Sequence, residues 1–402
     1  MNASFMYHNL GIREQECTKE EYQGGKTILH IRTKKKHICC PQCGSRHIIC
    51  SGKTVRDIRG VPIGSRQIIL RMSIQRVECK ECGCIRNEEV KFTRGKRRYT
   101  RGFERLIHDL SKMGTISDVA RFLDVSWDTV KDVQKEYLGR HYGHPSLKQV
   151  RRIGIDEFAV AKGHVYMTIV VDMDTGRVIY VGDGKGADAL DGFWDRVKRA
   201  GCSIESVATD LSQAFVSSVQ DNLPSAALVF DHFHVVKLMN DKLDKIRRAT
   251  YQKEHDENSR RVVRGQRWIL LCNGEELDES GQQRLQAALQ ANRPLAKAYY
   301  LKEALRRVWR QRSKEDADAV LDDWIRQASE SDVAILRGMA DTIVKHRNGI
   351  LAWYDHRTST GKIEGINNKI KTMKRQAYGF RDMDFFKLKI LSLHDSTYAF
   401  SG

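Results

Sequence analysis

Two pairs of cysteines constrain this chain more than any other feature of its sequence. Each pair has a two-residue spacer and is followed by a glycine, and the four residues are Cys40, Cys43, Cys79 and Cys82. A spacer of this length allows a tight turn to direct two thiolates at one ion, so the pairs predict a tetrahedral zinc site. Four thiolates leave no position for water, so Zn²⁺ is expected to be structural. Cys39 and Cys84 lie beside the pairs and leave the choice of ligands open.

The segment between the cysteine pairs is too long for a compact finger and is expected to form a small sheet. Residues 66–79, RQIILRMSIQRVEC, alternate apolar and polar side chains, which predicts a half-exposed strand. The chain starts without a basic segment followed by an apolar run, so no signal peptide is expected. In a cytosolic protein the 10 cysteines are metal ligands or reduced thiols rather than disulfides.

Positive charge is concentrated near the start of the chain. The formal net charge is +18, and residues 1–101 hold 22 Lys and Arg against 9 Asp and Glu. This excess favours a polyanionic partner, nucleic acid first and an anionic membrane surface second. No run of 18 apolar residues exists, so no transmembrane helix is expected. Residues 91–101, KFTRGKRRYTR, are expected to form a flexible basic linker that tracks DNA phosphates or a minor groove through Lys96, Arg97, Arg98 and Arg101.

Residues 115–138, TISDVARFLDVSWDTVKDVQKEYL, predict a helix, a turn and a second helix. The first helix has apolar residues spaced for one buried face, the turn lies at 124–126, and Ser126 can cap the second helix. A helix over 103–113 completes a trihelical unit of the kind that places its last helix in the major groove of DNA. An ordinary helical hairpin is the alternative, but the basic linker before it favours DNA binding. The side chains expected near the groove include Trp127 and Lys131.

From residue 151 to about 235 the pattern alternates between strands and helices, which predicts an α/β domain. Asp156 stands in the first strand, within IGIDEF, and Asp210 ends the fourth, within VATDLSQAF. Ligands of open α/β sheets bind at the carboxyl ends of strands, so two neighbouring aspartates there are candidates for a divalent cation. Other acids compete for this role on spacing alone, namely Glu157, Asp172, Asp174 and Asp183.

A third acid, Glu364, lies in the basic stretch STGKIEGINNKIKTMKRQAYGF. On a helix from about residue 361 it shares one face with Asn368, Lys371 and Arg375, while four apolar residues line the other face. Such a face offers a carboxylate to a metal and an amide and cations to phosphates. Glu364 as a salt-bridge partner of the nearby lysines is the alternative.

The order of these motifs, together with FDHFHVVKLMNDKLDKIRR at 230–248, resembles the ISL3 family of bacterial insertion-sequence transposases. The resemblance runs from about residue 37 to the end. It implies an α/β RNase H-like catalytic core with an all-α insertion, preceded by a zinc ribbon and a helix-turn-helix domain. Carried over residue by residue, it implies a catalytic DDE triad of Asp156, Asp210 and Glu364. It also implies a role for His234, three residues after Asp231, with His232 a weaker candidate; helix capping by Asp231 is the alternative.

The resemblance implies a DNA transposase that binds terminal inverted repeats and carries out DNA cleavage and strand transfer with two Mg²⁺ or Mn²⁺ ions. Its expected partners are double-stranded DNA, as element ends and target, and further copies of the chain in a dimer or larger assembly, with no membrane. Its expected location is the bacterial cytoplasm, associated with the nucleoid. A transposase-derived DNA-binding regulator and a simple nuclease are the alternatives. The expected domains cover residues 1–92, 93–145, 146–249, 250–355 and 356–402.

Overall fold

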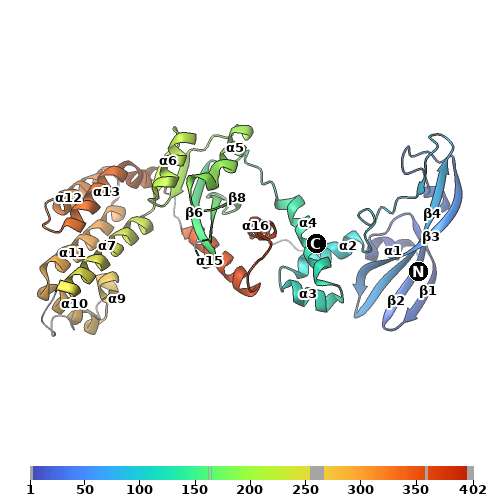
Figure 1. The fold of residues 1–402 in the computed structure, drawn as a ribbon, viewed down its shortest axis with the longest axis horizontal. Helices are drawn as coiled ribbons and strands as arrows, with labels where there is room; N and C mark the ends of the chain where they lie inside the picture. The colour runs from blue at the N-terminus through green and yellow to red at the C-terminus, as the bar shows by residue number, and fades with distance from the viewer. Residues whose placement is uncertain (1–2, 162, 164, 254–266, 358–360, 396–402) are drawn as a thin grey trace. The chain divides into compact units, whose positions relative to one another are not determined.

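The structure is a computed structural model that describes residues 3–161, 163, 165–253, 267–357 and 361–395 (Figure 1). The chain divides into two compact units, Met1–His141 with Asp395–Gly402, and Tyr142–His394. None of the described helices combines the length and the apolar character that are needed to cross a membrane.

The first unit begins with helix α1 (Ala3–Leu10) and a twisted sheet in the order β1-β2-β4-β3, with β5 added beside β4. The strands are β1 (Gln15–Gln23), β2 (Lys26–Thr33), β3 (Ile48–Ile63), β4 (Arg66–Cys79) and β5 (Ile85–Asn87). A one-turn helix, η1 (Lys35–His37), precedes the first cysteine pair. β4 alternates buried and partly exposed residues as its sequence predicts, and Leu70 and Met72 pack with Met6 in the core. The long β3–β4 hairpin therefore spans the gap between the cysteine pairs.

Three helices follow, α2 (Arg101–Leu110), α3 (Ile116–Leu123) and α4 (Trp127–Tyr142). Thr115 forms a capping box at the start of α3, and the Ser126 hydroxyl accepts a hydrogen bond of 3.1 Å from the Thr129 amide at the start of α4. Val119, Leu123, Val130 and Val133 form their common core with residues of α2. The predicted helix-turn-helix and its cap are confirmed.

The second unit contains a five-stranded sheet in the order β10-β9-β6-β7-β8. Its strands are β6 (Arg152–Ala161), β7 (Val165–Asp172), β8 (Val178–Asp183), β9 (Ser206–Thr209) and β10 (Ala227–Phe230). β6, β9 and β10 run parallel, whereas β7 is antiparallel to β6 and β8. This mixed order places β6 at the centre, between its hairpin partner β7 and the parallel strand β9.

Helices cover both faces of this sheet, as Figure 1 shows. One face packs against η2 (Ala187–Leu190), α5 (Asp191–Ala200) and α6 (Gln213–Asn222) through Phe193, Trp194 and Phe215. The other face packs against α15 (Gly361–Gln376) and α16 (Met383–Leu391) through Ile363, Ile366 and Phe386. Segments from both ends of this unit thus build one three-layered domain.

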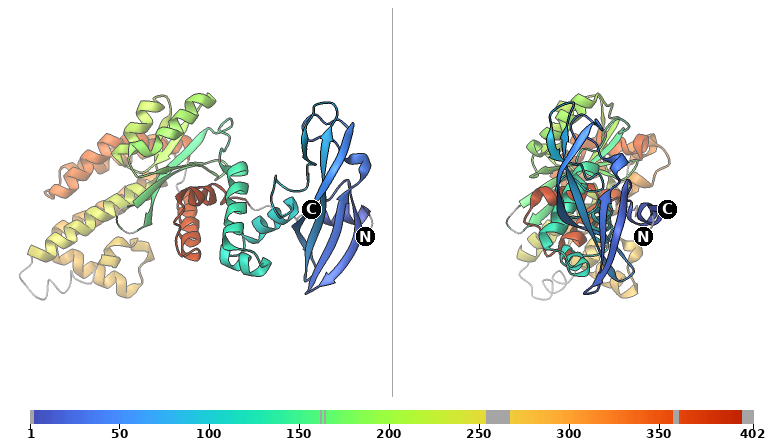
Figure 2. Two further views of the ribbon diagram at one scale, coloured as in Figure 1. Left: turned by 45° about the vertical axis from the view of Figure 1, so that its right-hand side comes forward. Right: turned by 90° about the vertical axis from the view of Figure 1, so that its right-hand side faces the viewer.

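A helical region lies between β10 and α15 in the sequence. It consists of α7 (His232–Lys253), α9 (Arg267–Leu271), η3 (Gly274–Glu276), α10 (Glu279–Ala291), α11 (Arg293–Arg306), η4 (Arg307–Arg310), α12 (Lys314–Ser329), α13 (Ala334–Leu351) and α14 (Trp353–His356). Figure 2 shows α7, in yellow-green to yellow, leaving the sheet beside the orange helices. The core of the region includes Trp324 and continues to Phe230 of β10, against which Gly349 packs without a side chain of its own. The predicted helical character of this region is confirmed for its described residues.

Candidate functional sites

Four cysteines meet at the end of the β3–β4 hairpin. The Sγ atoms of Cys40, Cys43, Cys79 and Cys82 all lie within 4.8 Å of one another. Cys40 and Cys82 are 3.6 Å apart, and Cys43 and Cys79 are 3.5 Å apart, both measured between Sγ atoms. Tetrahedral zinc with Zn–S bonds of about 2.3 Å separates its sulfurs by roughly 3.8 Å, so this cage has the size that Zn²⁺ requires.

Local backbone geometry builds each half of the zinc cage. Gly44 and Gly83 have φ values of +76° and +66°, and their amides donate to the carbonyls of Cys40 and Cys79. A side chain is strained at such angles, so glycine allows each turn to close around its two thiolates. Cys39 and Cys84 do not belong to the cluster among the described residues, which resolves the choice of ligands.

Asp156 and Asp210 lie side by side on the neighbouring strands β6 and β9, at the point where β9 ends. β6 pairs with β9 at Gly154–Ala208, and β9 pairs with β10 at Ala208–Val229. Neighbouring strands are about 4.8 Å apart. Continuing this register by two residues gives a row of three acids, one from each parallel strand: Asp156, Asp210 and Asp231.

Helix α15 packs along β6 and holds Asp156 in place. Ile363 lies over Gly154, where an added Cβ would come within 2.4 Å of it. Four residues further along the helix, Asn367 donates a 2.7 Å hydrogen bond from Nδ2 to Oδ2 of Asp156, and the Glu157 amide donates to Oδ1 at 2.9 Å. Lys374 then binds the carbonyls of Ala159 and Val160. The helix therefore runs along β6 in the same direction.

Crowding of acids and burial shape the electrostatics of this edge. Burial raises the pKa of Asp156, and the charge of Asp210 adds to this effect, whereas His234 and the hydrogen bonds to the carboxylate oppose it. Burial, reinforced by Asp210 and Asp156, raises the pKa of Glu157 to about 7. The Oε2 atom of Glu157 is buried and has no hydrogen-bond partner among the described residues. Carboxylates gathered in this way favour a bound cation, and the donor set is the hard oxygen type that Mg²⁺ and Mn²⁺ take.

Three other acids that the sequence offered as candidate metal ligands have partners within the fold. Asp172 accepts hydrogen bonds from the Asp174 amide and the Thr175 hydroxyl in the turn after β7. Asp174 pairs with Arg152, and Asp183 pairs with Lys387 at 2.6 Å. These contacts account for all three acids, whereas Glu157 stays a neighbour of the two aspartates.

Glu364 lies in the first turn of α15, one turn before Asn367, and is exposed. Among the described residues it has no hydrogen-bond or ion-pair partner, so the salt-bridge alternative finds no support. Within the described part of the chain, the carboxylates of Asp156, Asp210 and Glu364 do not all come within 4.8 Å of one another. The structure thus brings the two aspartates together and places the glutamate on the helix that covers them.

The first residues of α7 place two histidines near this edge. His234 is partly exposed, and its charge lowers the pKa of the Asp156 carboxyl. Asp231 is buried and accepts a 2.6 Å hydrogen bond from Nδ1 of His232, not from His234. The family resemblance ranked His232 lower, because its pattern places the histidine three residues after the aspartate, at His234.

The basic segment 91–101 is folded rather than free. Thr93 and Thr100 form a β-bridge, and Arg97 pairs with Glu104 at 3.1 Å and with Glu136. The expectation of a flexible arm is therefore wrong for the stretch around Arg97, since distant acids that the local sequence does not reveal hold it against α2 and α4. Lys91 and Arg94 pair with Glu14 and Glu104. The other cations of the segment are exposed: Lys96, Arg98 and Arg101.

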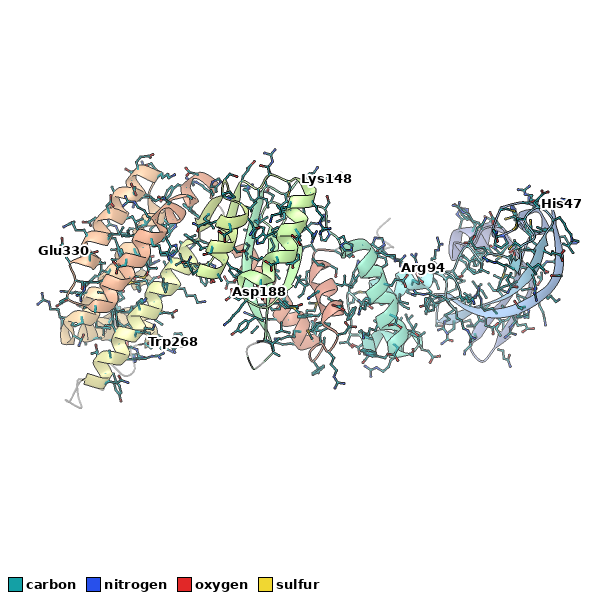
Figure 3. All side chains as sticks on the ribbon, turned by 45° about the horizontal axis from the view of Figure 1, so that its top comes forward. His47, Arg94, Lys148, Asp188, Trp268 and Glu330 are labelled. Carbon is teal, nitrogen blue, oxygen red and sulfur yellow. The ribbon has the colours of Figure 1, made fainter. Side chains whose placement is uncertain are left out.

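Other candidate DNA contacts lie on exposed helix surfaces. Trp127 is 45% exposed at the start of α4, with Lys131 Nζ 5.6 Å from its ring centroid. Trp268, which is 70% exposed, carries Arg267 over its ring in the helical region (Figure 3). On α15 the exposed residues beyond Glu364 include Asn368, Lys371 and Arg375.

Three family models match consecutive parts of the chain. The zinc-finger of transposases IS204/IS1001/IS1096/IS1165 matches residues 36–82, and the helix-turn-helix domain of transposase family ISL3 matches residues 88–138. The ISL3 transposase model matches residues 153–390. Together they cover both units of the structure.

Individual proteins are also similar to the chain. The transposase for insertion sequence element IS1001 of Bordetella parapertussis is 34% identical over 370 residues, which is 91% of each chain. The transposase for insertion sequence element IS1557 of Mycobacterium tuberculosis is 28% identical over 386 residues, 89% of this chain and 86% of that one. A solved structure, the Drosophila P element transposase strand transfer complex, is 10% identical with a TM-score of 0.36 over 61% of this chain and 77% of that chain. Because one model covers more than half of the chain and the Bordetella relative matches nearly all of it, the protein is a DNA transposase and belongs to the ISL3 family.

Proposed function

We propose that this transposase binds the terminal inverted repeats of its element and carries out divalent-metal-dependent DNA cleavage and strand transfer, with Asp156, Asp210 and Glu364 as a DDE triad. The proposal rests on one observation above all. Asp156, within β6, and Asp210, directly after β9, are in register on neighbouring parallel strands, under the helix that carries Glu364. We infer an RNase H-like core from the mixed five-stranded sheet with helices on both faces.

The carboxylates are suited to hold two divalent cations. Such a pair, when bound, activates the attacking oxygen and stabilises the leaving oxygen in phosphoryl transfer. Asp156 is oriented by Asn367 and the Glu157 amide, and Asp210 by the Ser212 amide at 2.9 Å. Glu364 is free of ion pairs with described residues, so it can join the site without breaking one. Glu157 adds a fourth acid that sequence spacing left among the competitors.

The reaction we infer has two balanced steps. In the first, water attacks the scissile phosphorus, the bond to the 3′ oxygen of the element end breaks, and a free 3′-hydroxyl results. In the second, that hydroxyl attacks a target phosphodiester, and the target strand leaves as a 3′-hydroxyl. Positioning and neutralisation of charge carry this chemistry, so a protein nucleophile is not required. His234 acts, in this proposal, on the charge balance of Asp156.

DNA recognition is assigned to the first unit and to α15. The exposed start of α4, with Trp127 and Lys131, suits major-groove entry, and the zinc-bearing sheet carries much of the excess positive charge. Beyond Glu364 on α15, the exposed Asn368, Lys371 and Arg375 suit phosphates near the scissile bond. Because two element ends must be joined, we expect the chain to act as a dimer or larger assembly on DNA in the bacterial nucleoid.

The decisive experiment compares wild type with Asp210→Asn on labelled element-end DNA in Mg²⁺ or Mn²⁺. We expect the variant to bind ends normally and to lose nicking and joining. Asp183→Asn is the matched control, because that acid pairs with Lys387 at the surface and should leave cleavage unchanged. If wild type binds ends but cuts under no divalent ion, the chain is a DNA-binding regulator. If wild type and Asp210→Asn cut equally, Asp210 is not a ligand.

A further inference from the structure

An acid–histidine pair next to the proposed active site has no role in the proposed metal chemistry. Asp231 is 1% exposed, and its Oδ1 accepts the 2.6 Å hydrogen bond from His232 Nδ1. The His232 side chain is 56% exposed. Capping α7 would require only the aspartate, so it leaves unexplained why a buried carboxylate holds an exposed imidazole in a fixed orientation.

The pair lies on the same sheet edge as the two catalytic aspartates. Phe230 of β10 pairs with Thr209 of β9, so Asp231 and Asp210 follow at equal positions on adjacent strands. At a strand spacing of about 4.8 Å, the start of α7 lies one strand from Asp210 and roughly 10 Å from Asp156. Duplex DNA carries one phosphate per strand for about every 3.4 Å of helix axis. A strand whose scissile phosphate lies at the aspartates therefore has further phosphates within reach of His232.

The surroundings of the imidazole supply hydrogen-bond donors. Among the described residues His232 has no second polar partner, which leaves Nε2 available. The hydrogen bond with Asp231 raises the pKa of His232, while burial and the charge of Arg306 oppose this shift. Trp309, whose ring centroid is 6.2 Å away, has a buried Nε1–H with no acceptor among the described residues. Arg306 is paired with Glu275 and Glu303, so the charged groups that act on the ring are Asp231 and this guanidinium.

We propose that His232 in its imidazolium form, with Nδ1–H donated to Asp231, is a phosphate-binding residue that donates Nε2–H to a non-bridging oxygen of a phosphate flanking the scissile one. The location of the scissile phosphate rests on the proposed function. His232 is a positioning residue in this proposal, because it fixes the DNA backbone and takes no part in bond breaking. Its partner is the DNA strand itself, which is recognised through charge and not through sequence.

The test measures end-DNA binding as a function of salt in an Asp210→Asn background, where turnover is absent. Each lost phosphate contact reduces the slope of log K against log salt by about 0.9. We expect His232→Gln to reduce the slope by this amount. Between 50 and 200 mM salt, the affinity of the parent for end DNA should then fall by a factor about 3.5 times larger than the factor for His232→Gln. His232→Arg should restore the slope, and Asp231→Asn should weaken it. His144→Gln, at an exposed histidine outside the site, is the control and should change nothing.

An unchanged slope in His232→Gln overturns the proposal. A normal slope together with slower cleavage in the Asp210-containing protein also overturns it, because the ring would then act in proton transfer. Thermal unfolding of each variant shows whether the fold is intact, and recovery by His232→Arg excludes simple misfolding. Since the binding measurement needs no catalysis, failure of the metal assignment and failure of this proposal give different results.

Discussion

The two units of this transposase each gather polar side chains at a candidate metal site, but the two sites are built differently. In the first unit, four cysteines are gathered within 4.8 Å, and Arg97 is held by two glutamates. In the second unit, Glu157 has a buried oxygen without a partner, Lys389 is largely withdrawn from water, and Glu364 has no ion pair among the described residues. The cysteine cage of the first unit therefore needs only one zinc ion to be complete. The second leaves groups unsatisfied that cations and DNA can complete.

This difference separates a structural site from a reactive one. Local turns assemble the zinc cage, and metal binding there is expected to stabilise folding directly. The acids of the second unit come from strands and a helix far apart in sequence, and their mutual repulsion works against the metal-free state. Four predictions test this contrast, from the largest expected effect to the smallest.

Loss of a zinc ligand should have the largest effect. Cys40→Ser, at a buried ligand, should release zinc and unfold the first unit, because structural zinc contributes roughly 10 kcal/mol or more to small domains. The second unit should keep its own unfolding transition. Metal analysis and calorimetry measure both. Cys39→Ser, next to the ligand but outside the cluster, is the control; loss of zinc from that variant and not from Cys40→Ser would contradict the ligand set.

Loss of a carboxylate from the proposed metal site should have the reverse effect on metal-free stability. Asp156→Asn removes a buried negative charge from beside Asp210, so the metal-free variant should be more stable than wild type. Wild type should gain about 2.7 kcal/mol when Mg²⁺ or Mn²⁺ is present at 100 times its dissociation constant, and the variant should not. Thermal unfolding with and without the ion checks both changes. A variant that is less stable without metal would show that Asp156 has a structural role.

Replacement of the two adjacent asparagines of α15 by alanine should affect different steps, cleavage in one case and DNA binding in the other. Asn367 is buried and bonded to Asp156, so Asn367→Ala should slow cleavage about 10- to 100-fold by releasing a metal ligand from its orientation. Asn368→Ala, one residue away and exposed, should change end binding and leave the cleavage rate of bound DNA nearly unaltered. Single-turnover cleavage at saturating protein separates these effects. Equal losses of rate in both variants would argue against the positioning role of Asn367.

Replacement of Lys389 should have the smallest effect, and that effect should depend on pH. Burial alone lowers its pKa to about 8 from the 10.5 of the free side chain. The unfolded chain therefore binds more protons between these values, and stability should rise as pH increases from 8 to 10.5. Lys389→Met removes the free-energy cost of burying this charged amine. It should raise stability at pH 7 by at most about 3 kcal/mol, and by about 1 kcal/mol if the folded chain relaxes locally.

The gain of Lys389→Met should disappear above pH 10.5. Unfolding in denaturant at pH 7 and pH 10.5 measures it. A gain that is independent of pH would come from packing and not from the buried charge.

Patterns within single elements predicted much of the fold. The alternation in β4, the capping Ser126 and the strand and helix order of residues 151–235 are all present in the structure. Asp156 and Asp210 could be predicted as neighbours because one lies within the first strand of the α/β sheet and the other follows the fourth. Asn367 could have been found too, since it lies at i+4 from Ile363 on the buried stripe of α15, where a polar residue needs a partner.

Features that depend on distant parts of the chain could not be predicted from local patterns. Arg97 finds Glu104 and Glu136 only after α2 and α4 pack together. The pairing of Asp231 with His232 rather than His234 depends on how the chain leaves β10. The choice among the six clustered cysteines likewise depends on the turns at Gly44 and Gly83, which set the direction of each thiol.

The late position of α15 and α16 has a consequence for how the protein is made. These helices cover the sheet face formed by Phe158, Met167 and Ile169, yet a ribosome delivers them only after the whole helical region that follows β10. A chain that stops before residue 361 exposes this apolar face and lacks both Asn367 and Glu364. Synthesis of residues 361–391 is thus the step that completes the three-layered domain of the second unit.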